Sequence, residues 1–281
     1  MKLLRYGAVG LEKPAAIDLE GNIRCLSDVV DDIDGASIQR TSIERLKKLD
    51  LSKLPLVSDV VRIGPCVAGV GKFLCIGLNY SDHAKESGMA VPPEPVVFSK
   101  FVSAICGPND DIVKPRGSTK LDWEVELGLV IGEQTSYVSE SEAMASVAGF
   151  CVCNDISERE FQLERSGQWD LGKGCDTFGP IGPWLVTPDE IDDVMDLKMW
   201  LEVNGRRFQD GNSKTMIFSP AKIVSFLSQY MTLMPGDVIS TGTPPGVGFG
   251  QNPQVYLDVG DSMTLGIQGL GLQTQRVIAD Y

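Results

Sequence analysis

The feature that most constrains the fold is an apolar segment, Trp123–Ile131, that carries two glutamates, Glu124 and Glu126. Its length and its aliphatic, β-branched residues predict a strand. Side chains at positions i and i+2 of a strand leave the same face, with Cα atoms about 7 Å apart. Two adjacent carboxylates in an apolar element repel each other unless a cation lies between them. Because Gly128 and Val130 continue the glutamate face, a local polar site in a covered sheet is favoured over a solvated polar face.

A third carboxylate follows a second predicted strand, Val147–Asn154, as Asp155. Between the two strands, Ser139 and Glu142 have the spacing of a capping box, which predicts a short helix. The order strand, helix, strand could bring Asp155 to the glutamate pair. Three carboxylates suit Mg²⁺ or Mn²⁺. Zinc is less favoured because the chain has one histidine and no cysteine pair at the two-residue ligand spacing.

The single histidine, His83, lies just beyond a predicted buried strand, Lys72–Ile76. Glu86 follows it by three residues. Histidine is the only side chain whose ordinary pKa allows proton exchange near neutrality. His83 is therefore the one imidazole candidate for proton chemistry, and a loop histidine that caps a backbone group is the alternative.

The chain of 281 residues predicts one large domain, residues 66–281, and a small N-terminal domain, residues 1–65. The small domain is predicted to contain a hairpin near residues 3–22 and a helix over 42–49. The remainder predicts a mixed, strand-rich α+β class. A helix is predicted to start at Ser219-Pro220, with Ile223, Phe226, Leu227 and Tyr230 on its buried face.

Composition excludes several functions. The net charge of −13 argues against binding to nucleic acids or acidic membranes. No stretch is long and apolar enough to be predicted to cross a bilayer. Several of the seven cysteines, such as Cys75, Cys151 and Cys153, lie in predicted apolar strands. They are expected to be reduced core thiols of a cytoplasmic protein.

Five motifs together resemble the fumarylacetoacetate hydrolase superfamily. They are Asn79-Tyr80-x-x-His83-x-x-Glu86, Glu124-x-Glu126, Asp155, Lys173 and the loop Thr241-Gly242-Thr243-Pro244-Pro245-Gly246-Val247-Gly248. The resemblance runs from about Lys72 to the C-terminus. Five motifs in the right order are far more specific than any one of them. The glycine-rich loop alone is a weak signal because it matches neither the dinucleotide fingerprint nor the P-loop.

The resemblance implies a mixed β-sandwich roll like the C-terminal domain of that family, paired as a homodimer. It also implies roles for nine residues: Glu124, Glu126 and Asp155 as ligands of Mg²⁺ or Mn²⁺, His83 and Glu86 as an acid–base dyad on a lid that continues through Ser87–Pro93, Lys173 as a positive charge at the oxyanion, Arg159 and Gln162 as substrate contacts, and Thr243 as a binder of the substrate carboxylate.

Three of these roles have simpler alternatives. Lys173, in a glycine-rich loop, could be a solvated lysine. Arg159 could pair with Glu158 or Glu160 on the surface, and Thr243 could only shape the turn before Pro244.

For activity, the resemblance implies metal-dependent hydrolysis of a carbon–carbon bond in a 2,4-diketo acid, such as a 2,4-diketo-3-deoxy sugar acid. Acylpyruvate hydrolysis and oxaloacetate decarboxylation are alternatives within the family. A non-catalytic ligand-binding member is the alternative from another class. Because both residues of the water-activating dyad are present, hydrolysis is favoured over decarboxylation.

Overall fold

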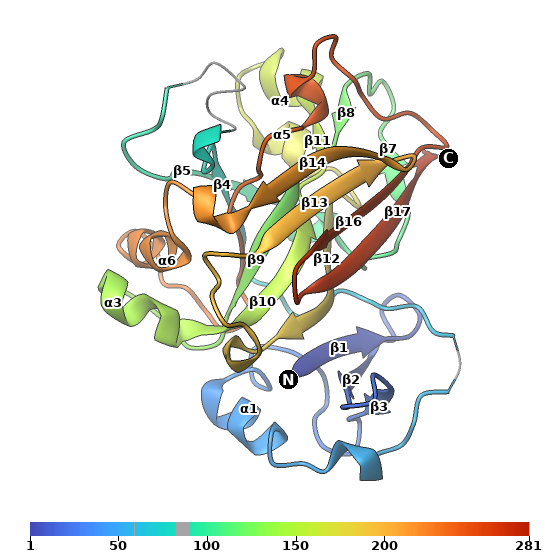
Figure 1. Cartoon of the computed structure of the whole chain (residues 1–281), viewed down its shortest axis with the longest axis vertical. Helices are drawn as coiled ribbons and strands as arrows, with labels where there is room; N and C mark the ends of the chain where they lie inside the picture. The colour runs from blue at the N-terminus through green and yellow to red at the C-terminus, as the bar shows by residue number, and fades with distance from the viewer. Residues whose placement is uncertain (59, 83–89, 281) are drawn as a thin grey trace.

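The computed structural model describes residues 1–58, 60–82 and 90–280. Within them, two large sheets dominate the molecule (Figure 1). The strands are β1 (Lys2–Tyr6), β2 (Lys13–Ile17), β3 (Ile23–Cys25), β4 (Phe73–Gly77), β5 (Val96–Lys100), β6 (Ile105–Cys106), β7 (Ile112–Lys114), β8 (Leu121–Asp122), β9 (Val125–Ile131), β10 (Val147–Asn154), β11 (Ser157–Glu158), β12 (Gly179–Val186), β13 (Lys198–Val203), β14 (Arg206–Asn212), β15 (Val238–Ser240), β16 (Ser262–Ile267) and β17 (Gly271–Ala279).

The helices are short and connect or cover these strands. The α-helices are α1 (Arg40–Leu46), α3 (Glu140–Ala143), α4 (Arg159–Leu163), α5 (Asp170–Lys173) and α6 (Pro220–Ser228). The 3₁₀ turns are η1 (Leu51–Lys53), η2 (Val102–Ala104), η3 (Met144–Ser146), η4 (Pro188–Glu190), η5 (Ser213–Thr215) and η6 (Gly248–Gly250). The predicted strand-rich α+β class is therefore confirmed.

The larger sheet has the order β3-β2-β1-β12-β10-β9-β15-β4-β5, with β6 paired to β12. A second sheet, β14-β13-β16-β17-β7, packs over one of its faces. The central strand β9 is buried on both sides. One face of β9 enters the core shared by the two sheets, with the side chains of Val125, Leu127, Leu129 and Ile131. Val130 enters a second core on the opposite face of the larger sheet. This explains why the predicted strand is apolar on both faces.

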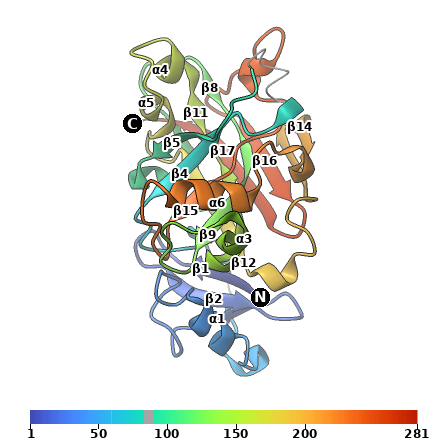
Figure 2. The same cartoon turned by 90° about the vertical axis from the view of Figure 1, so that its left-hand side faces the viewer.

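The N-terminal segment extends the larger sheet instead of forming a sheet of its own. Strand β1 pairs antiparallel with β12, with Leu3 opposite Leu185. Strands β2 and β3 follow outward, and these elements lie with α1 at the lower end of the molecule in Figures 1 and 2. Buried side chains from this segment and from β9, β10 and β12 form the second core. The domain boundary near residue 65 stays a prediction.

Local signals in the sequence explain the helix starts. Ser139 and Glu142 form the predicted capping box at α3. The Ser219 hydroxyl accepts a hydrogen bond from the Lys222 amide at the start of α6, as its position before a proline indicated. The predicted buried face of α6 is wrong at Tyr230, which is 69% exposed because the helix ends at Ser228.

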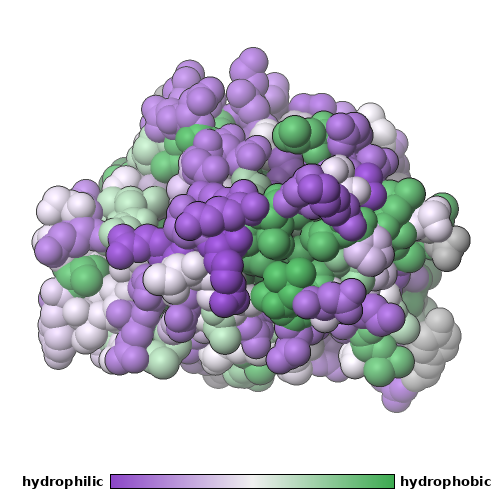
Figure 3. All heavy atoms as spheres, turned by 90° about the horizontal axis from the view of Figure 1, so that it is seen from below, coloured by the Kyte–Doolittle hydropathy of each residue, from purple (hydrophilic) through white to green (hydrophobic). Residues whose placement is uncertain are grey.

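Apolar side chains gather on part of the face at the N-terminal end of the molecule (Figure 3). Exposed apolar residues of the N-terminal segment include Val9, Leu11, Leu19 and Leu56. The homodimer that the family resemblance implies stays a prediction, and sedimentation would test it. No helix among the described residues is long and apolar enough to cross a membrane.

Candidate metal centre and cavity

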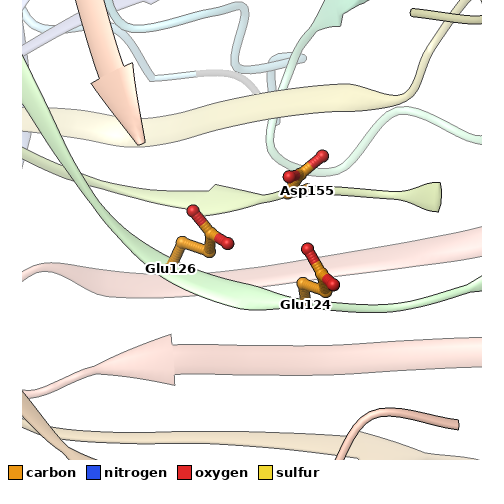
Figure 4. A group of neighbouring side chains, drawn as sticks. All are labelled: Glu124, Glu126 and Asp155. Atoms are coloured by element: carbon orange, nitrogen blue, oxygen red, sulfur yellow. The ribbon is translucent and has the colours of Figure 1, made fainter. Parts of the chain in front are cut away.

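The pairing of β9 with β10 brings the three predicted carboxylates together. In this antiparallel pair Cys153 lies opposite Glu126, so the chain leaves β10 next to the start of β9. There the Asp155 amide donates to the Glu124 carbonyl oxygen over 2.9 Å. One carboxylate oxygen each from Glu124, Glu126 and Asp155 lies within 4.8 Å of the others, and all three residues are buried (Figure 4). Strand β9 begins at Val125, so Glu124 lies just before the strand rather than inside it.

Three buried cations neutralise most of this negative charge. Lys173 Nζ donates to Glu124 Oε2 over 2.7 Å and to Asp155 Oδ2 over 2.8 Å. Lys100 Nζ donates to Asp155 Oδ1 over 2.5 Å, and Arg159 Nη2 donates to Glu124 Oε1 over 2.6 Å. Lys173 is therefore not a solvated lysine. Arg159 pairs with Glu124 inside the protein, not with Glu158 or Glu160 on its surface.

Two members of this charge network were not identified in the sequence. Lys100 is the last residue of β5, an edge strand, where a lysine is usually solvated. No pattern marked it as buried. Asp122 accepts a hydrogen bond from Arg159 Nε over 2.8 Å and is also buried. Asp122 lies two residues before Glu124, just as Glu124 lies two residues before Glu126, so the period-two spacing could have predicted Asp122 as a member of the cluster.

Glu126 differs from the other two carboxylates because it contacts no cation among the described residues. Its Oε2 accepts hydrogen bonds from the Ser240 hydroxyl over 2.6 Å and from the Gly242 amide over 2.9 Å. Burial, together with the negative charges of Asp155 and Glu124, raises the pKa of Glu126 well above its usual value. Glu124 is buried as well, but Lys173 and Arg159 hold its pKa down to about 2.

The raised pKa of Glu126 predicts a pH dependence for the metal-free protein. Between the ordinary glutamate pKa of 4.5 and the raised value, the folded protein retains a proton that the unfolded chain has released. The free energy of unfolding should therefore fall as the pH rises through this window. Glu126→Gln removes the titration, so the variant should lose less stability than wild type between about pH 5.5 and about pH 8. Urea unfolding in EDTA measures both, and equal losses would contradict this.

Helices α4 and α5 and the residue before α5 carry five of the cavity's side chains, among them Leu163 of α4. Arg159 and Gln162 come from α4, and the Arg159 Nη1 donates to Gln162 Oε1 over 3.0 Å. Trp169 is the N-cap residue of α5 and Lys173 is the last residue of that helix, so they stand at positions i and i+4, which lie on the same side of a helix. The two helices pack closely because Gly172 has no side chain: a Cβ there would lie 2.5 Å from the Gln162 amide nitrogen.

The glycine-rich loop after β15 is held against the start of β9. The Thr243 hydroxyl donates to the Val125 carbonyl oxygen over 2.9 Å and accepts from Gln209 Nε2 over 2.8 Å. Gln209 Oε1 in turn accepts from the Val125 amide. Gly246 has φ +104°, and a Cβ there would lie 1.9 Å from the Phe208 carbonyl oxygen. These contacts support the turn-shaping alternative for the hydroxyl of Thr243, although Thr243 also lines the cavity.

A cavity opens over the carboxylates. Its polar lining consists of Glu124, Glu126, Arg159, Gln162, Lys173 and Thr243, so it brings together six of the nine residues given roles from the sequence. Its apolar lining includes Ile76, Leu78, Phe98, Leu163, Trp169 and Phe249. The predicted dyad, His83 and Glu86, lies outside the described residues, as does the lid as far as Met89. The lining of the cavity thus combines a cluster of charged side chains with apolar side chains.

The start of the lid motif is anchored beside the glycine-rich loop. Asn79 Nδ2 donates to the carbonyl oxygens of Thr241 and Phe218, and its Oδ1 accepts from the Phe218 amide. Tyr80 is fully buried, and burial raises its pKa well above the usual value. The hydrogen bonds of Asn79 therefore fix the position from which the chain enters the predicted lid. Gly77 and Leu78, just before it, line the cavity.

Comparison with known proteins identifies the family. Residues 72–278 match the model of the fumarylacetoacetate (FAA) hydrolase C-terminal family. The chain belongs to this family. A relative from Burkholderia cenocepacia (strain HI2424), whose name assigns it only provisionally to the hydrolases, is 59% identical over 277 residues, covering 98% of each chain.

Solved structures of the fumarylacetoacetate hydrolase family share the fold over the whole chain. Fumarylacetoacetate hydrolase from the psychrophile Exiguobacterium antarcticum is 34% identical with a TM-score of 0.88, and each chain is fully covered. Maleylpyruvate hydrolase from Sphingobium sp. SYK-6 is 25% identical with a TM-score of 0.84, again over the full length of both. The likeness confirms the roll predicted from the resemblance.

The donor set at the centre fits a divalent metal of the kind that this family uses. Carboxylate oxygens are hard ligands, which Mg²⁺ and Mn²⁺ prefer over the softer sulfur and imidazole donors of zinc sites. Within the described residues the cluster has four carboxylates, including Asp122, and three cations, and Glu126 is the carboxylate that has no cation partner. The position of Glu126, without a cation partner, marks where added positive charge would be most stabilising.

Proposed function

We propose that this protein is a divalent-metal-dependent hydrolase that cleaves a carbon–carbon bond of a 2,4-diketo acid. The observation that carries this proposal is the meeting of Glu124, Glu126 and Asp155 within 4.8 Å in a buried cavity. A bound Mg²⁺ or Mn²⁺ would act as a Lewis acid toward the oxygens of a 2-oxo acid. The buried ammonium of Lys173 would add a fixed positive charge beside the oxygen on which negative charge develops.

The reaction adds water to the carbonyl at C4 and breaks the bond between C3 and C4. The electron pair of that bond passes to the C2–C3 fragment as an enolate, which takes a proton at C3 to give pyruvate. The C4 fragment leaves as a carboxylic acid. In this proposal His83 removes the proton of the attacking water, and Glu86 orients the imidazole. Arg159 and Gln162, held together by a hydrogen bond, would fix the substrate's position.

The lining of the cavity favours a substrate with one carboxylate. Among the described residues that line it, the cations are Arg159 and Lys173, and both already pair with carboxylates of the site. A second substrate carboxylate would therefore meet no available cation in the described part of the cavity. The lining therefore favours a monocarboxylic substrate over a dicarboxylic one such as the maleylpyruvate named for the Sphingobium relative.

The substrate we favour is 2,4-didehydro-3-deoxy-L-rhamnonate, which would yield pyruvate and L-lactate in cytoplasmic degradation of L-rhamnose or L-fucose. The segment Trp169–Pro180, with its Gly-Lys-Gly-Cys-Asp sequence, resembles that of bacterial hydrolases of this compound. The distal end of 2,4-didehydro-3-deoxy-L-rhamnonate carries a methyl group, which suits the apolar lining of the cavity. The same apolar lining makes a simple acylpyruvate the second candidate.

Purified protein with Mg²⁺ should release pyruvate from 2,4-didehydro-3-deoxy-L-rhamnonate. Turnover of acylpyruvates or oxaloacetate without turnover of the sugar acid would show that the favoured substrate is wrong. If none of these compounds yields pyruvate, the hydrolase proposal itself fails, and a non-catalytic ligand-binding protein becomes the better description.

Replacing the one histidine should separate chemistry from metal binding. His83→Ala should lower kcat by about 10²- to 10⁴-fold, because it removes the proposed general base. Mn²⁺ affinity, measured by calorimetry, should stay unchanged because the three carboxylates remain. Activity at the wild-type level in His83→Ala would show that the base is another residue.

A further inference from the structure

The apolar part of the cavity includes a compact group of side chains from three elements. Trp169, at the start of α5, meets Phe98 of β5 edge-on, with ring centroids 5.4 Å apart. The Lys173 ammonium lies 5.1 Å from the centroid of the same phenylalanine ring. Trp169 also reaches the end of β4 at Gly77. We call Gly77, Leu78, Phe98 and Trp169 the apolar wall.

Gly77 belongs to the apolar wall because of the space it leaves. A Cβ at Gly77 would lie 3.2 Å from Trp169 Cη2, which is a tight contact, and 2.8 Å from Trp169 Cζ3, which is closer than real Cβ contacts. The backbone of Gly77 is not in the left-handed region, so its conformation does not demand glycine. The absence of a side chain there therefore lets the indole ring lie against the end of β4.

Leu78 is held in a conformation that leucine seldom adopts. Its φ is +54°, in the left-handed region, where a Cβ crowds the following carbonyl oxygen. Such residues persist where the surrounding structure fixes them, and they concentrate at functional sites. Leu78 lines the cavity. The turn after β4 thus presents backbone at Gly77 and a strained leucine side by side on the apolar wall.

We propose that Trp169 is the residue that determines substrate specificity, and that the apolar wall receives the uncharged group attached to C4 of the substrate. This deepens the proposed function and rests on it. Lys173 and Trp169 lie one helical turn apart on α5, so the group that contacts the carboxylates and the group that contacts the substrate's distal end are fixed in relation to each other. Gly77 sets how far back the indole ring lies, and hence how long a group the wall accepts.

The test compares wild type, Trp169→Ala, Gly77→Ala and the control Leu171→Ala, all with Mg²⁺, on acylpyruvates of increasing chain length. Leu171 is an exposed residue of the same helix and does not line the cavity. Each added methylene that the wall buries is worth about fourfold in kcat/KM. Because the Trp169 ring limits the length of the group that the wall accepts, Trp169→Ala should make room for methylenes that wild type excludes and raise the hexanoylpyruvate to acetylpyruvate ratio at least about tenfold. Gly77→Ala pushes the ring into that room and should lower the ratio, and Leu171→Ala should leave it unchanged.

Binding of saturated 2-oxo acids gives a second readout that needs no turnover. These compounds lack the C4 carbonyl, so they cannot be cleaved. In calorimetry, the dependence of Kd on chain length should differ between wild type and Trp169→Ala, and Trp169→Phe should resemble wild type. If wild type cleaves diketo acids but neither the rate ratio nor this dependence changes, the apolar wall assignment is wrong and the hydrolase stands. If wild type cleaves none, the hydrolase proposal fails, and the binding series alone supports or overturns the wall.

Discussion

Lys100→Met is expected to lower the free energy of unfolding by about 3–5 kcal/mol, because it leaves a buried carboxylate without one of its cations. Lys100 is 2% exposed, and its ammonium contacts Asp155 Oδ1 over 2.5 Å and the Ile156 carbonyl oxygen over 3.0 Å. After the change, Lys173 is the cationic partner that Asp155 keeps within the described residues. Urea unfolding in EDTA measures the loss without a contribution from bound metal.

The same substitution at an exposed lysine is the matched control. Lys53 pairs with Asp50 over 3.1 Å, and both side chains are largely exposed. Lys53→Met should therefore cost less than about 1 kcal/mol. Adding Asp155→Asn to Lys100→Met should recover part of the loss, since the unpaired charge is gone. Equal destabilisation by Lys53→Met and Lys100→Met would show that the buried ion pair does not hold the edge strand.

Glu126→Gln is expected to lower metal-dependent turnover strongly while making the metal-free protein more stable at about pH 8. The amide keeps the size of the carboxylate and can still accept from Ser240 and Gly242. It removes the carboxylate of the cluster that contacts no cation among the described residues, so no described cation loses its partner. If catalysis draws about 4 kcal/mol from the metal, kcat/KM should fall about 10³-fold.

Mn²⁺ titration and urea unfolding measure the two effects separately. Asp122→Asn is the control, because Asp122 lies two residues before Glu124 and binds Arg159 without joining the three-carboxylate group. It should keep Mn²⁺ affinity within about tenfold, as expected of a residue that acts through a neighbour. Wild-type Mn²⁺ affinity in Glu126→Gln would remove this glutamate from the proposed ligand set.

The sequence predicted the carboxylate cluster because its causes are local. Period-two spacing places Glu124 and Glu126 together, and two apolar strands joined by a short capped helix pair readily. The same reasoning could not reach Lys100. An edge-strand lysine is usually solvated, and only the approach of α5 and Asp155 buries this one.

Contacts between distant segments were also beyond prediction. The pairing of Leu3 with Leu185 joins the N-terminal strand to a strand whose sequence shows no preference for it. The burial of Arg159 likewise depends on Asp122 and Glu124 from another part of the chain. The roles of Arg159 and Lys173 came from resemblance, and the structure supplies the ion pairs that explain why these positions carry cations.

The junction of β1 with β12 means that the residues matched by the family model share a sheet with the N-terminal segment. A chain trimmed to residues 72–278 would expose the backbone donors and acceptors of β12 that β1 now satisfies. It would also uncover the apolar faces of β9 and β10 that the first 65 residues now shield. An exposed, apolar edge strand of this kind promotes pairing with a strand of another molecule. We therefore expect the N-terminal segment to protect the rest of the chain against aggregation by covering this edge strand.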